Sequence, residues 1–97
     1  MSPLLNNFTG AILLSLILLV SENSFASRTI RLVDVPSEVV TAIEKKFTGA
    51  KMLDAEVDQK KNKTIFEVEI CHKKDLYEVT STKAGKILNV DFAGTCA

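Results

Sequence analysis

The sequence predicts an α+β fold in which one helix packs on one face of a four- to five-stranded antiparallel meander sheet. Residues 51–92 divide into four segments in which apolar and polar side chains alternate, with short polar turns between them. Alternation with a period of two is typical of strands that bury one face. Residues 36–47 have helical periodicity instead, and this helix supplies the cover that the apolar face needs.

The strand order follows from pairing each strand with the next across its turn. A polar turn at residues 60–63 joins the first two strands, and closing it by pairing Gln59 with Thr64 brings only apolar residues opposite each other on one face. A slip of one residue would turn all of them out of the core, so the register is strongly specified. The predicted pairs are Leu53–Ile70, Ala55–Val68 and Val57–Phe66.

Two further turns complete the meander. Residues 72–75 join the second strand to the third at 76–82. Ala84 and Gly85 are expected to form a two-residue hairpin turn, because glycine tolerates a positive φ angle. The predicted apolar face consists of Leu53, Ala55, Val57, Phe66, Val68, Ile70, Tyr77, Val79, Leu88, Val90 and Phe92.

The helix that covers this face has clear boundaries. Pro36 and Glu38 stand in its first turn and two lysines in its last, which suits the helix dipole. Gly49 follows its end, as is common for helices. We interpret its apolar stripe as core, and we expect residues 27–34 to add a strand. The stripe consists of Val39, Val40, Ile43 and Phe47.

The N-terminal region predicts export. Its apolar run, residues 11–20, is followed by Glu22 and by a small-x-small ending at Ala26, the pattern that signal peptidase accepts. A run of about ten residues is too short to span a bilayer, which needs about twenty. We therefore expect a secretory signal peptide at residues 1–26, no stable membrane anchor, and a single periplasmic or secreted domain at residues 27–97.

The charge balance disfavours nucleic acid as a partner. The sequence holds 12 basic and 12 acidic residues, and all the basic ones follow the predicted leader. Loss of Glu22 with the leader would leave a single positive charge in excess. Because neutralising a phosphate backbone needs a basic excess, we expect no nucleic-acid partner.

Several short motifs follow one another along residues 29–92. They are the proline-opened helix, the Phe-x-Gly-Ala exit at 47–50, the Tyr-Glu-Val strand at 77–79 and the Gly-Lys turn at 85–86. Together they resemble the PepSY-like family of small exported bacterial modules. The resemblance implies a periplasmic or secreted, non-catalytic module, which in some relatives is attached to metallopeptidases as an inhibitory propeptide element. It carries over no catalytic residues.

The sheet face opposite the helix is predicted to be acidic, because the same register sets carboxylates directly opposite one another. Such pairs destabilise a sheet by a few tenths of a kcal/mol or more. One interpretation is a solvated face whose acids are screened, or neutralised by Arg31 and the turn lysines. The other is a docking surface for a basic partner, or a weak cation site. The candidate interaction residues are Asp54, Glu56, Glu67, Glu69, Glu78 and Asp91.

Cys71 and Cys96 are disulfide candidates, because export makes a disulfide chemically permissible. The strand at 76–82 separates them, which sets their strand axes about 9–10 Å apart, beyond the disulfide reach of about 7 Å. The residues after Phe92 can curl inward and close this gap. An intramolecular bridge is the favoured interpretation, and an intermolecular bridge or free thiols are the alternatives.

The pair Cys71-His72 predicts neither a catalytic site nor a metal site. The chain has one histidine, no C-x-x-C-H motif and no second ligand cluster. No third residue is evident to orient a base, and no glycine loop could hold a phosphate. We expect no catalytic residues, no cofactor and no metal site.

The leading prediction is therefore an exported, non-catalytic protein-interaction module that docks through its sheet, with peptidase inhibition or regulation as one form of this role. The expected partner is an unknown protein, such as a peptidase or another protein with a basic surface. The alternative is a sensor-type periplasmic protein that binds a small ligand or cation at the acidic face or at the corner formed by Cys71 and His72. A third is a structural partner that dimerises through a strand edge. We expect a monomer or a weak dimer.

Overall fold

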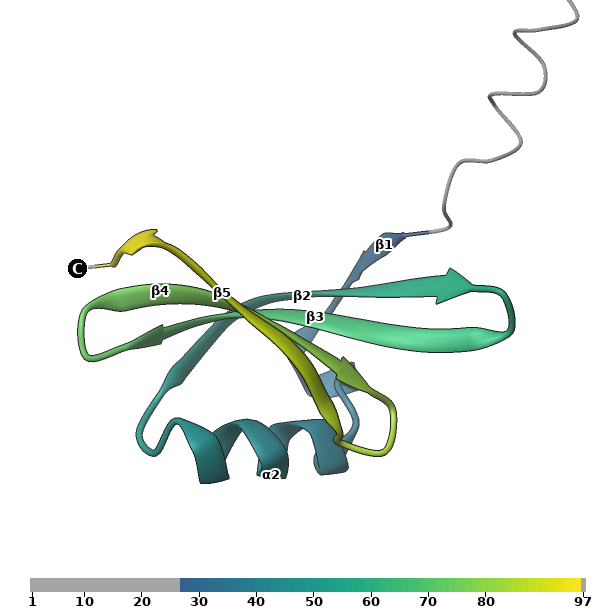
Figure 1. The fold of residues 1–97 in the computed structure, drawn as a ribbon, viewed down its shortest axis with the longest axis horizontal. Helices are drawn as coiled ribbons and strands as arrows, with labels where there is room; N and C mark the ends of the chain where they lie inside the picture. Colours follow the sequence, from purple (N-terminus) through teal and green to yellow (C-terminus); the bar gives the residue numbers. More distant parts are fainter. Residues whose placement is uncertain (1–26, 97) are drawn as a thin grey trace, which may run out of the picture.

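The computed structural model describes residues 27–96 and shows one α-helix and a five-stranded antiparallel sheet (Figure 1). The sheet order β1-β2-β3-β4-β5 is a simple meander, so the predicted α+β architecture is confirmed. The predicted signal peptide lies outside the described residues. The elements are β1 (Arg28–Ile30), the 3-10 helix η1 (Leu32–Asp34), α2 (Ser37–Lys46), β2 (Lys51–Lys60), β3 (Lys63–His72), β4 (Asp75–Thr82) and β5 (Ile87–Thr95).

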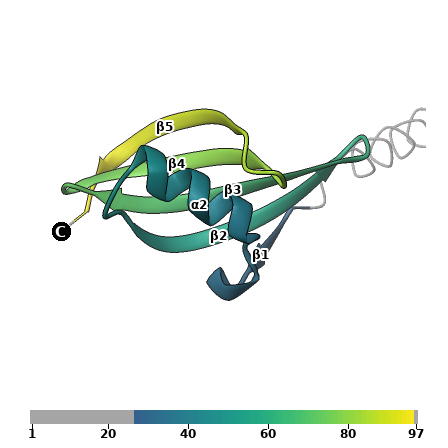
Figure 2. The same cartoon turned by 90° about the horizontal axis from the view of Figure 1, so that it is seen from below.

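The α2 helix lies diagonally across one face of the sheet, and the other face, which we call the open face, has no helix on it (Figures 1 and 2). Its first turn begins at Pro36, whose carbonyl oxygen accepts hydrogen bonds from the N–H groups of Val39 (2.9 Å) and Val40 (3.1 Å). Gly49, at φ +86°, allows the chain to turn from the helix into β2. No helix in residues 27–96 is long and apolar enough to cross a membrane.

The core lies between α2 and the sheet. Val39 and Ile43 of the predicted stripe are fully buried, and Val40 and Phe47 pack against the core while partly exposed. The stripe therefore covers the sheet as the helical period predicts. The buried core residues are Val35, Val39, Ile43, Ala55, Val57, Phe66, Val68, Ile70 and Val79.

The strand expected over residues 27–34 is shorter than predicted. β1 pairs with β2 only over Arg28–Ile30, and the chain then forms the 3-10 helix η1 before it enters α2. The side chains of Arg31 and Asp34 form an ion pair of 3.0 Å across this short turn. β1 therefore covers only the middle of the outer edge of β2.

The register between β2 and β3 agrees with the prediction except at one end. Ala55 lies opposite Val68 as predicted, but the partner of Ile70 is Met52 rather than Leu53. An irregularity between Met52 and Asp54 inserts one extra residue and shifts the alternation. Leu53 is consequently 40% exposed, and Met52 packs against the core instead.

The turn between β4 and β5 also differs from the prediction. The N–H of Thr82 donates to the carbonyl oxygen of Lys86 (2.9 Å), and the N–H of Gly85 donates to that of Thr82 (3.0 Å). Three residues, with Gly85 at φ +91° as the last of them, therefore lie between the hydrogen-bonded residues Thr82 and Lys86 in place of the predicted two-residue turn. This is the next most common hairpin connection, in which a type I turn is followed by a glycine bulge.

A bulge within β5, next to the glycine bulge of the turn, restores the predicted register beyond this point. Ser81 lies opposite Ile87 and Thr80 opposite Asn89, so Leu88 is the extra residue. The predicted core position of Leu88 is therefore wrong, and its side chain is 47% exposed. Val79 and Val90 are opposite each other as the sequence predicts.

Phe92 was expected in the core but is 63% exposed. It does face Tyr77, with ring centroids 6.0 Å apart. β5 is the edge strand of the sheet, so Phe92 has a neighbouring strand on one side only. One ring contact is too little cover to bury a side chain of this size.

Candidate functional site

The structure places the predicted acidic residues on the open face, directly opposite one another. β2 and β3 bring Asp54 opposite Glu69 and Glu56 opposite Glu67. β4 and β5 continue the row, because Glu78 lies opposite both Glu69 and Asp91. We call these carboxylates the acidic face. Its members are Asp54, Glu56, Glu67, Glu69, Glu78 and Asp91.

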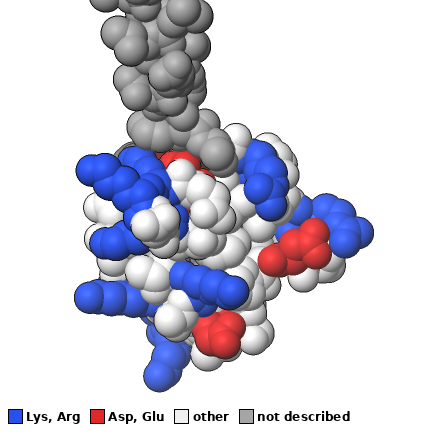
Figure 3. Space-filling model, turned by 90° about the vertical axis from the view of Figure 1, so that its right-hand side faces the viewer, with Lys and Arg blue, Asp and Glu red and all other residues white. Residues whose placement is uncertain are grey.

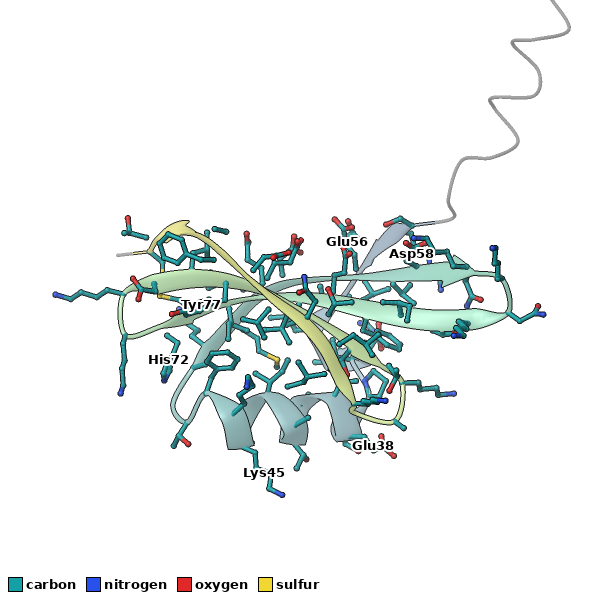
Figure 4. All side chains as sticks on the ribbon, viewed as in Figure 1. Glu38, Lys45, Glu56, Asp58, His72 and Tyr77 are labelled. Atoms are coloured by element: carbon teal, nitrogen blue, oxygen red, sulfur yellow. A yellow bond between two sulfur atoms is a disulfide. The ribbon has the colours of Figure 1, made fainter. Side chains whose placement is uncertain are left out.

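Most of these side chains surround one shallow hollow of about 100 Å³. Glu56, Glu67 and Glu69 are half-buried, while Asp54 and Glu78 are exposed at its rim. Figure 4 shows the labelled Glu56 pointing away from the sheet on the side opposite α2. The hollow, which we call the acidic hollow, is lined by Asp54, Ala55, Glu56, Glu67, Glu69 and Glu78.

Neutral groups provide the hydrogen bonds that the structure shows to the acidic face. The hydroxyl of Ser27 donates to Glu56 Oε1 (3.1 Å), and the amide of Asn89 donates to Asp91 Oδ2 (2.9 Å). Arg31, a predicted neutralising residue, forms its ion pair with Asp34 instead. Arg31 therefore does not balance the charge of this face.

Glu67 lies at the centre of the row and has a raised pKa. Partial burial is the largest cause, because it disfavours the ionised carboxylate. The negative charges of Glu78, Glu56 and Asp58 raise the pKa further, and the positive charge of Lys60 lowers it. The repulsion expected between opposed carboxylates is thus present at this residue.

Asp58 belongs to the same surface, although it is absent from the predicted set. It lies opposite Ile65, and Figure 4 shows it on the same side of the sheet as Glu56. Its Oδ1 atom is buried and has no hydrogen-bond partner in the described part of the chain. The alternation of Asp54, Glu56 and Asp58 along β2 was the signal that could have identified it.

The acidic hollow is not a formed metal site. Within residues 27–96 there is no group of three or more His, Cys, Asp or Glu side chains that could hold a metal ion. The carboxylates stand side by side on three strands of an open sheet, and Ca²⁺ needs six to eight oxygens gathered around one point. The geometry fits an extended charged surface better than a cation cage.

The corner formed by Cys71 and His72 is structural. Cys71 and Cys96 form an intramolecular disulfide with their Cα atoms 5.9 Å apart, as the favoured interpretation predicts. The C-terminal tail curls inward because the N–H of Cys96 donates to the carbonyl oxygen of Lys74 (2.9 Å). His72 Nε2 lies 3.2 Å from the carbonyl oxygen of Thr48, and its ring packs against another aromatic ring.

Comparisons with known proteins add no relatives: no protein-family model, curated protein or solved structure matches the chain. The resemblance to PepSY-like modules therefore stays a prediction from local motifs.

Proposed function

We propose that this chain is an exported, non-catalytic protein-interaction module that docks onto a basic partner through the acidic face. The observation that carries the proposal is the acidic hollow on the uncovered side of the sheet. α2 buries one sheet face, so the open face is available to a partner. A basic surface placed there would relieve the repulsion between opposed carboxylates, and this relief favours binding.

A peptidase is the candidate partner, on the strength of the PepSY-like motifs. In that interpretation the module restrains the enzyme by occupying part of its surface. Export is supported by the disulfide between Cys71 and Cys96, since such bonds persist in oxidising compartments. The apolar leader that ends at Ala26 is consistent with the same destination.

The test is affinity capture from an extract of exported proteins, with the chain produced through its own leader so that the disulfide can form. Glu67→Gln combined with Glu69→Gln removes two charges from the acidic face. Glu38→Gln combined with Glu44→Gln removes two from exposed positions on α2 and is the matched control. We expect a basic-surfaced protein to be retained by the original chain and by the control but not by the face variant.

Purified components then decide the outcome. The captured protein should bind the chain with an affinity that falls steeply as salt screens the charges. If it is a peptidase, its activity should fall when the chain is added. Equal capture by all three forms of the chain would show that docking does not use the acidic face and would overturn the proposal.

A further inference from the structure

A second hollow lies on the open face, at the end of the sheet where the β2–β3 and β4–β5 turns are found. Ile65 and Thr82 are opposite each other and alternate with core residues, so they share the face with Glu67. Ile65 is half-buried and Leu88 is 47% exposed, so part of the lining is apolar. This hollow, about 560 Å³ in volume, is lined by Lys63, Thr64, Ile65, Thr82, Lys83, Ala84, Lys86 and Leu88.

The rim of this hollow is basic, and we call the whole hollow the lysine groove. Lys63, Lys83 and Lys86 are all exposed around it. Figure 3 shows lysine and arginine side chains gathered on this end of the molecule. The two turns bring together lysines that are about twenty residues apart in the sequence.

The open face thus changes sign along its length. On β3 the residues that point to this side are, in order, Lys63, Ile65, Glu67 and Glu69, so that basic, apolar and acidic positions follow one another within a single strand. On β2 the acids extend further, to Asp58. A surface with this order is complementary to itself when a copy is turned end over end.

We propose that the partner of this face is a second copy of the chain. In this dimer the open faces of the two sheets meet, and a twofold axis lies between the sheets, perpendicular to their strands. The axis places the lysine groove of each copy over the acidic hollow of the other. The apolar positions Ile65 and Leu88 then lie near the axis. The contact is isologous and closes at a dimer, in contrast to a head-to-tail contact, which could propagate. The result is a two-sheet sandwich with the helices outside, its sheets about 10 Å apart.

The size of the open face sets the expected affinity of the dimer. Four strands at about 4.8 Å spacing and about nine residues long present a face of roughly 600 Å². Because the axis lies near Ile65, close to one end of β3, the two copies overlap over only part of this area. Stable interfaces bury about 800 Å² on each partner, so this dimer is at the weak end and should dissociate in the micromolar range or above. Its charge pairs make it depend on ionic strength. This inference rests on the proposed function, because it names a partner for the same face.

Sedimentation equilibrium tests the dimer over low micromolar to millimolar concentrations of the full exported chain. At an ionic strength of about 0.01 M we expect the mass of a dimer, and at about 1 M that of a monomer, with at least a tenfold rise in the dissociation constant. A chain that stays monomeric at every concentration in both buffers would overturn the inference.

Two charge-reversed variants make the test specific. Glu67→Lys with Glu69→Lys places two positive charges inside the acidic hollow, and Lys63→Glu with Lys86→Glu places two negative charges on the rim of the lysine groove, where Lys83 remains. Each variant alone should be monomeric at low ionic strength, and an equal mixture should form a dimer again. Glu38→Lys with Glu44→Lys on α2 is the control and should leave the dimer intact. Circular dichroism verifies that each variant is folded.

The outcomes separate this inference from the proposed function. A dimer that survives both reversals uses another surface, such as the free edge of β5, and a mixture that fails to associate excludes the twofold arrangement; either result overturns the inference. Capture of a different protein that depends on Glu67 and Glu69, by a chain that does not self-associate, would leave the proposed function standing.

Discussion

Gly85 shows how a single residue sets the distance between the helix and the last hairpin. Its φ angle is +91°, a conformation that residues with a side chain rarely adopt. A Cβ atom there would lie 2.5 Å from the carbonyl oxygen of Glu38 in the first turn of α2. The turn and the helix can approach this closely only because Gly85 has no side chain.

We predict that Gly85→Ala lowers the free energy of unfolding by about 2–3 kcal/mol. The positive φ angle accounts for roughly 1–2 kcal/mol, and the clash with Glu38 adds to it. In a domain of this size the change lowers the melting temperature by about 10 °C or more, which thermal unfolding measures.

Gly49→Ala is the matched control for this substitution. Gly49 also has a positive φ angle, +86°, but a Cβ atom added there would meet nothing within 4 Å. The control should lose only the conformational part, about 1 kcal/mol. Equal losses at Gly49 and Gly85 would contradict the close contact with α2.

Individual residues also show where sequence reasoning stops. Alternation placed Glu56 and Glu67 on one face, and the register set by the turn between Gln59 and Thr64 predicted that they lie opposite each other. It could not predict that Met52 replaces Leu53 in the core, since a bulge inserts one residue without a local composition signal. Leu88 was misplaced for the same reason.

At the scale of elements, the C-terminal tail is attached to the sheet at two points. Its disulfide joins Cys96 to Cys71 on β3, past the intervening β4, and its backbone donates to Lys74 in the β3–β4 turn. The sequence showed that both cysteines belong to one end of the sheet. The sequence alone could not establish the inward curl of the tail, because the curl depends on a backbone hydrogen bond for which the side chains give no signal.

We predict that Cys71→Ser combined with Cys96→Ser lowers the free energy of unfolding by about 3.5 kcal/mol, the loop-closure entropy for the 25-residue separation. So small a domain has little stability to spare. Urea unfolding of the oxidised chain and the double variant measures the loss. Reduction of the original chain should reproduce it, and unchanged stability after reduction would show that the bridge adds nothing.

In the whole molecule the two sheet faces differ, because α2 covers one and leaves the other open. The helical stripe and the alternating strands together define the covered face, and both are strong periodic signals in the sequence. The acidic face could be predicted equally well, because its members come from the same alternation. The lysine groove could not, since it depends on how the β2–β3 and β4–β5 turns approach each other in space.

The charge on the open face makes the stability of the whole molecule depend on pH, and Glu67 reports this effect. Its pKa is raised in the folded chain, chiefly by burial and then by Glu78 and Glu56, from an ordinary value near 4.5. The folded chain therefore keeps this proton more readily than the unfolded chain. Ionisation of Glu67 thus reduces stability, and the loss develops as the pH rises from about 4.5 through the raised pKa.

Glu67→Gln removes this ionisation, so the variant should be the more stable form at about pH 7 and low salt, by roughly 0.5 kcal/mol, the scale of one opposed charge pair. The advantage should disappear below about pH 4, where Glu67 of the original chain is protonated in both states. Urea unfolding at the two pH values measures it, and Glu44→Gln, on the exposed side of α2, is the control. An advantage that persisted in acid would come from packing, whereas one confined to neutral pH assigns it to the ionisation of Glu67, which burial and the neighbouring carboxylates of the open face disfavour.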